Sequence, residues 1–163
     1  MAPVEGPILV LGIGNLVMSD DGIGVRVVQN LSRRCRFPER VELLDGGTLG
    51  LDLLPRLEGV THLLMVDAVE TGGSPGTLVR LTGSDIPVTL ETKVSPHQMG
   101  LKDLLAVARL QGNAPEEMVL LGVQPACIEM GLELSPPVAS RVAELEEQVI
   151  RQLDEWGAEA MPV

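Results

Sequence analysis

The stretch Ile8-Leu9-Val10-Leu11-Gly12-Ile13, followed by Gly14-Asn15, determines the fold class. Six consecutive apolar residues are typical of a strand that is buried on both faces. Apolar residues then recur at the spacing of one helix face: Ile23, Val27, Val28 and Leu31. The start of the chain therefore predicts a strand, a tight turn and a helix, as in α/β proteins.

Further apolar runs predict four more strands, at residues 41–45, 63–68, 77–81 and 118–123. Helical patterns separate most of them, at residues 48–57, 101–112 and 136–149. Only the turn-forming stretch Gly72–Gly76 precedes residues 77–81, so we expect that strand to run antiparallel. The order predicts a three-layer α/β/α sandwich with a mixed, mostly parallel sheet.

Length and composition limit the possible functions. The 163 residues suit one domain, residues 1–163. One Phe, one Trp and no Tyr predict an aliphatic core. The 23 acidic residues exceed the 12 basic ones, which gives a formal net charge of −11. Nucleic acids and anionic membranes require a basic surface, so neither is an expected partner.

Two cysteines, Cys35 and Cys127, form no disulfide framework, which favours a reducing compartment. The N-terminus lacks a basic signal-peptide region, and no apolar run reaches the ~18 residues of a membrane span. We expect a cytoplasmic protein that is a monomer.

In open α/β sheets, ligands bind beyond the carboxyl ends of the strands. At those ends we expect four segments: Gly14–Asp21, Asp45–Gly50, Asp67–Thr71 and Gln124–Glu129. Gly46, Gly47 and Thr48 are a candidate edge of a substrate cleft, because a glycine-rich backbone can hold an extended peptide. The segment Ser95–Gln98 is expected to be a loop that reaches the same edge of the sheet.

The Gly12–Asn15 turn resembles the start of a dinucleotide-binding motif, but Val17 replaces its third glycine. The acids Asp20 and Asp21 would also repel a pyrophosphate at the helix N-terminus. A nucleotide-binding module is therefore a less favoured alternative. A Cys127 nucleophile is also less favoured, because free cysteines are often simply buried.

Three side chains are candidate metal ligands. One of Asp20 and Asp21 is expected to satisfy the N-terminus of the following helix, which leaves the other for a ligand. Asp67 interrupts an apolar strand, and a buried carboxylate must be paired or coordinate a metal. His97 lies in the expected loop, whereas His62 opens a strand at the opposite edge. Two carboxylates and one imidazole suit nickel, zinc, copper or iron.

Taken together, four sequence blocks resemble the nickel–iron hydrogenase maturation endopeptidases. The blocks are Gly12–Asn15 with Asp20–Gly24, Asp45–Gly50, Asp67-Ala68 and Ser95–Gly100. Leu121–Pro125 matches the last strand of the family, and the resemblance extends from Ile8 to Trp156. It implies a three-layer α/β/α fold with a mixed five-stranded sheet.

The resemblance also implies an activity. Such endopeptidases remove a C-terminal extension from the hydrogenase large-subunit precursor after nickel insertion, so the precursor supplies the nickel and no organic cofactor is needed. The catalytic and nickel-contacting residues fall on Asp21, Asp67 and His97, and none of them is assigned as general base. Some members carry Glu where this chain has Asp21, and Asp20 is an alternative ligand. A nickel carrier or sensor that cuts nothing is the main alternative function.

Overall fold

The main sheet has five strands in the order β3-β1-β4-β6-β5. The computed structural model describes residues 5–47, 50–86 and 96–163, with the backbone alone for residues 96–100. The strands are β1 (Ile8–Ile13), β3 (Val41–Gly47), β4 (His62–Ala68), β5 (Leu78–Thr82) and β6 (Glu117–Val123). β3, β1, β4 and β6 are parallel, and β5 is antiparallel to β6. The predicted mixed sheet is confirmed.

The neighbour of β5 is β6 and not β4. Leu78 pairs with Val123, and Thr82 pairs with Val119. The antiparallel direction follows from the short connection after β4, as the sequence predicts. The choice of neighbour depends on β6, which enters the sheet later in the chain and lies between β4 and β5. A short connection therefore determined the direction of β5 but not its pairing.

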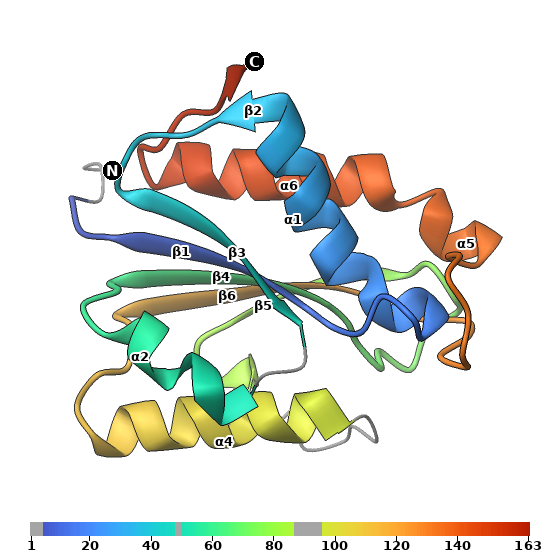
Figure 1. Cartoon of the computed structure of the whole chain (residues 1–163), viewed down its shortest axis with the longest axis horizontal. Helices are drawn as coiled ribbons and strands as arrows, with labels where there is room; N and C mark the ends of the chain where they lie inside the picture. Colours follow the sequence, from blue (N-terminus) through green and yellow to red (C-terminus); the bar gives the residue numbers. More distant parts are fainter. Residues whose placement is uncertain (1–4, 48–49, 87–95) are drawn as a thin grey trace.

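Helices cover both faces of the sheet (Figure 1). On one face lie α1 (Ile23–Arg34) and α6 (Val142–Glu155), with the short α5 (Pro136–Ala139) before α6. On the other face lie α2 (Leu54–Leu57) and α4 (Pro96–Leu110). Two 3₁₀ turns complete the connections, η1 (Ser19–Gly22) before α1 and η2 (Gly50–Leu53) before α2, and β2 (Cys35–Arg36) pairs with β7 (Met161–Pro162).

Two predicted helices differ in detail from the structure. The terminal helix expected from Pro136 onward is divided into α5 and α6 at Ser140 and Arg141. The helix expected over residues 48–57 is a 3₁₀ turn followed by one short helix in its described part, Gly50–Leu57. Pro55 lies early in α2, where its missing N–H costs nothing.

The core consists of two aliphatic layers, one on each face of the sheet. Successive residues of β4 alternate between them: Leu64 and Val66 pack with α1 and α6, whereas Leu63 and Met65 pack with α2 and α4. Trp156 is the one aromatic side chain fully buried among the described core residues. Within the described part of the chain, none of the helices combines the length and hydrophobicity that crossing a bilayer requires.

Candidate functional site

The connections of the sheet place a topological switch point at the carboxyl ends of β1 and β4. The chain leaves β1 through α1 to reach β3 on one side, and it leaves β3 through α2 to reach β4 on the other side. These two connections pass over opposite faces of the sheet (Figure 1). In open α/β sheets, a ligand site lies where the chain direction switches in this way. Asp21 follows β1, and Asp67 is the penultimate residue of β4.

Asp67 is completely buried at this end of β4. Its Oδ1 accepts a hydrogen bond of 2.8 Å from the N–H of Ala68. Met65 and Val69, two residues before and after it, belong to the core layer of α2 and α4. Because side chains alternate along a strand, Asp67 faces the side that α4 covers.

Asp21 lies in η1 and is 5% exposed. Its Oδ2 accepts a hydrogen bond of 3.1 Å from the N–H of Asn15. The turn η1 packs against β4, so the Asp21 turn lies beside the strand that carries Asp67. Gly24 permits this approach, because a Cβ at that position would lie 2.0 Å from the carbonyl oxygen of Val66.

Asp20 has a different role from its neighbour Asp21. Its Oδ2 accepts hydrogen bonds from Ala126 N (2.9 Å), Cys127 N (3.0 Å) and Ser135 Oγ (2.7 Å), and its Oδ1 accepts one from Ser135 N (2.7 Å). The residue is fully buried. Asp20 therefore holds the segment 126–135 rather than the start of α1. This arrangement favours Asp21 over Asp20 as a candidate ligand.

His97 is the second residue of α4, where the sequence predicted a loop. Pro96 begins the helix, which agrees with the preference of proline for the first helical position. The His97 side chain lies outside the described residues. Figure 1 shows that α4 begins at the end of the sheet where η1 and the end of β4 lie. Among the side chains that the structure describes, no three His, Cys, Asp or Glu residues form a metal-binding group.

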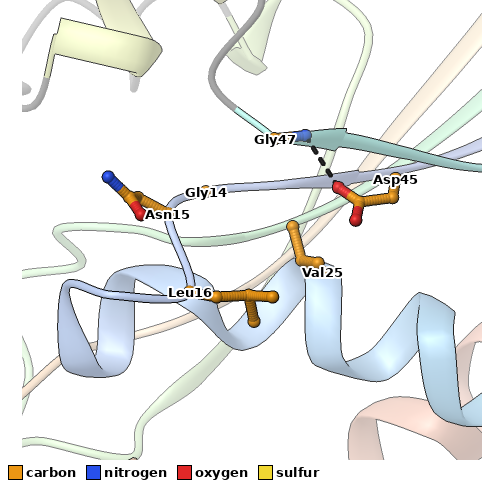
Figure 2. A pocket seen from close by; sticks show the side chains of 6 residues that line it. All are labelled: Gly14, Asn15, Leu16, Val25, Asp45 and Gly47. Atoms are coloured by element: carbon orange, nitrogen blue, oxygen red, sulfur yellow. Dashed lines mark hydrogen bonds between the residues drawn. The ribbon is translucent and has the colours of Figure 1, made fainter. Parts of the chain in front are cut away.

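One residue of the predicted cleft edge, Gly47, lines a pocket beside the β1–α1 turn. Figure 2 shows this pocket, which is lined by Gly14, Asn15, Leu16, Val25, Asp45 and Gly47. The N–H of Gly14 donates to the carbonyl of Gly47 (2.9 Å), and the N–H of Gly47 donates to Asp45 Oδ1 (3.0 Å). Gly46 is buried, and a Cβ there would lie 2.6 Å from Leu11. Thr48 lies outside the described residues.

The part of Asn15 was not predicted from the sequence. Its side-chain Oδ1 accepts a hydrogen bond from Val17 N (3.1 Å), while its own N–H binds Asp21. The signal was available, because Asn commonly bonds the backbone two residues later in a turn. The Asn15 N–H is therefore used by a carboxylate of the same chain, and Asp45 lines the adjacent pocket. Both features disfavour a bound phosphate.

The fold is that of an α/β protein with two buried aspartates, Asp21 and Asp67, at the switch point of its sheet. A model of the hydrogenase maturation protease family matches residues 25–152, and the chain belongs to this family. The Escherichia coli protein named hydrogenase 2 maturation protease is 42% identical over 156 residues, which cover 95% of each chain. A Rhodobacter capsulatus hydrogenase expression/formation protein, HupD, is 44% identical over 93% of this chain and 73% of its own length.

Solved structures agree with the sequence comparison. The hydrogenase maturating endopeptidase HybD from E. coli superposes with a TM-score of 0.92 at 41% identity, covering 96% of this chain and 97% of that one. A [NiFe] hydrogenase maturation protease from Thermococcus kodakarensis has a TM-score of 0.73 at 27% identity, with 90% and 98% covered. The family resemblance and the α/β fold predicted from the sequence are confirmed. The protein is a protease, and hence a hydrolase, with a role in hydrogenase maturation.

Proposed function

We propose that this protein is an endopeptidase that removes the C-terminal extension of a nickel–iron hydrogenase large-subunit precursor after nickel insertion. It acts as a cytoplasmic monomer. The observation that carries the proposal is the pair of buried carboxylates, Asp21 and Asp67, on neighbouring elements at the switch point of the sheet. They lie in a chain that is 42% identical to a hydrogenase 2 maturation protease.

Asp21, Asp67 and His97 are the proposed ligands of the nickel ion that the precursor carries. Carboxylate oxygens and an imidazole nitrogen form a mixed N/O donor set, and imidazole suits nickel. The net charge of −11 favours the approach of a cation to the protein. His97 contributes from the start of α4, on the face toward which Asp67 points. In this proposal, η1, β4 and α4 each supply one donor.

Recognition of the metal sets the position of the peptide. When the nickel of the precursor binds these residues, the scissile segment is held in one register, which lowers the entropic part of the barrier. The metal can polarise the scissile carbonyl or activate a water molecule. The backbone of Gly46 and Gly47 is the proposed edge along which the extended peptide lies, since Gly47 borders the open pocket beside Asn15.

The decisive experiment compares two forms of the precursor. Purified enzyme is incubated with nickel-loaded and with nickel-free large-subunit precursor, and the products are weighed by mass spectrometry. We expect loss of a C-terminal peptide from the nickel-loaded form only. A precursor that already lacks its extension is the matched control and should keep its mass.

The other outcomes separate the alternatives. Equal cleavage of both forms would refute nickel recognition while leaving the protease activity. Cleavage of neither form, combined with transfer of nickel to or from the precursor, would favour the carrier or sensor.

A further inference from the structure

Exposed apolar side chains gather beside the candidate site. Eight large apolar residues of the described chain are exposed, and four of them lie on two neighbouring segments: Val17 (47%), Ile128 (47%), Met130 (85%) and Leu132 (68%). We call these four residues the apolar patch. Singly scattered apolar side chains are normal on a protein surface, whereas a group of them marks an interaction site.

The two segments of the apolar patch are joined through their backbones. Gly131 forms a parallel bridge with Met18. The N–H of Gly131 donates to the carbonyl of Val17 (2.8 Å), and the N–H of Ser19 donates to the carbonyl of Gly131 (2.9 Å). The Ser19 hydroxyl donates to the carbonyl of Glu129 (2.7 Å). Val17 is thereby held next to the chain between Ile128 and Leu132.

Hydrogen bonds with polar side chains hold the segment at several points. Asp20 accepts the four hydrogen bonds from Ala126, Cys127 and Ser135 that are described above. The Arg26 guanidinium also donates to the carbonyl of Leu132. The main chain is therefore anchored at both ends and in the middle while the apolar side chains point outward. A surface that is ordered in advance loses little conformational entropy when a partner binds.

We propose that the apolar patch is the docking surface for an apolar segment of the hydrogenase precursor that also carries basic residues. The proposal rests on the proposed function. Val17 lies in the same β1–α1 connection as Asp21, so a precursor whose metal reaches Asp21 lies next to the patch. The exposed Glu129 and Glu133 alternate with the patch residues. Their charge complements basic side chains of the partner.

The same charges disfavour a second copy of this chain as the occupant. A dimer through the apolar patch would bring Glu129 and Glu133 of two copies together. Each copy also carries a net charge of −11. Like charges at an interface oppose association. The precursor is therefore the occupant to which the test is directed.

The test replaces patch residues by polar residues of similar size and unchanged charge. Met130→Gln with Leu132→Asn should raise KM for the nickel-loaded precursor by roughly tenfold or more, because two apolar side chains lose their burial. We expect kcat to stay the same. The matched control is Met161→Gln with Leu110→Asn, which alters exposed residues outside the patch. It should leave both constants unchanged. Glu129→Gln with Glu133→Gln should weaken the rise of KM with ionic strength.

The outcomes distinguish this proposal from the proposed function. An unchanged KM in the Met130/Leu132 variant, with normal cleavage by the wild type, would overturn the docking surface alone. If the wild type cleaves no precursor, the proposed function fails, and titration calorimetry with the precursor then tests the patch by the same variants. A wild type that sediments as a dimer, with a monomeric patch variant, would show a self-interface and overturn the proposal.

Discussion

Two adjacent acidic residues, Asp20 and Asp21, have different structural roles. Asp20 is buried under the segment 126–135 and accepts four hydrogen bonds from it. Asp21 is also buried but accepts a hydrogen bond from the N–H of Asn15 in the β1–α1 connection. Neighbouring side chains of a turn point in different directions, so one residue can anchor a loop while the next faces a ligand.

The first prediction concerns Asp20. Asp20→Ala leaves the partly buried N–H groups of Ala126, Cys127 and Ser135 without their acceptor, which costs about 3 kcal/mol. The melting temperature should fall by roughly 2–4 °C per kcal/mol, measured by calorimetry. Asp20→Asn retains one acceptor oxygen and should lose less. A melting temperature within experimental error of the wild type for Asp20→Ala would contradict the anchoring role.

The second prediction concerns the proposed ligands. Asp67→Asn keeps the shape of the side chain and removes its charge, and His97→Ala removes an imidazole. Each variant should lose precursor cleavage while it keeps most of its thermal stability. Cleavage rate and melting temperature are measured on the same preparations. Full cleavage by both variants would refute the ligand assignment, and a loss of cleavage that only followed unfolding would leave both residues structural.

Asp21→Glu tests whether Asp21 is the third ligand. If Asp21 is a ligand, Glu keeps the carboxylate and should preserve cleavage, as the members with Glu at this position suggest. The hydrogen bond from Asn15 N must then form with a longer side chain. A variant that folds normally but has lost cleavage would show that the length of the side chain matters as well as its charge.

At the scale of elements, the close approach of α1 to the sheet determines where the η1 turn, which carries Asp21, lies relative to β4. Gly24 lies in the first turn of α1, and its missing Cβ leaves room for Val66 of β4 and Ile13 of β1. A Cβ there would lie 2.0 Å and 2.6 Å from the two carbonyl oxygens. Backbone oxygens in a central sheet cannot move away cheaply. The helix must therefore shift, together with the η1 turn that precedes it.

The third prediction follows from that contact. Gly24→Ala should destabilise the protein by about 3 kcal/mol, as overpacking of a dense core does. The molecules that stay folded should also cleave the precursor more slowly, because the shift displaces Asp21. Gly112→Ala is the control: the position has φ of +74° with open space around it, so it should cost only about 1–2 kcal/mol of backbone strain. Thermal melts and cleavage rates compare the two. Equal effects would show that packing at Gly24 is unimportant.

The strands also show which features of the fold could be predicted from the sequence. Runs rich in apolar residues predicted β1 over its full length and the other four strands of the main sheet to within two residues, whereas the short β2 and β7 were not predicted. A central strand such as β1 is easily recognised in a sequence, because a strand buried on both faces needs no polar residue. The neighbour of β5 was not predictable, because it depends on β6, about forty residues later.

The burial of one candidate site residue was predictable for a similar reason. An aspartate within an apolar strand is conspicuous, so Asp67 was readily identified and is completely buried. The separate role of Asp20 was not, because its partners Ala126, Cys127 and Ser135 are more than a hundred residues away in the chain. The amino-acid sequence does not indicate in which direction the main-chain N–H groups of a loop point, so these hydrogen bonds could not be predicted.

At the scale of the whole molecule, the two histidines lie at opposite ends of the sheet. His62 is the first residue of β4, and Asp67 lies near its last. The ring of His62 contacts Trp156 edge-on at 4.9 Å between centroids, and its Nε2 lies 3.3 Å from Glu117 Oε2. His97 belongs to the start of α4, at the end where the chemistry is proposed. The length of β4 therefore separates a packing histidine from a proposed ligand.

The last prediction uses this separation. His62→Gln removes the ring contact with Trp156 and should destabilise the protein by about 1–2 kcal/mol, a usual effect for one buried substitution. Cleavage per folded molecule should stay at the wild-type value, because no group at the carboxyl end of the sheet is altered. His97→Ala should give the reverse pattern, with cleavage lost and the melting temperature kept. Measuring both quantities for both variants, well below their melting temperatures, tests the assignment of the two ends. If a folded His62→Gln protein failed to cleave nickel-loaded precursor, the reacting groups would extend beyond the carboxyl end of the sheet, and the proposed site would be incomplete.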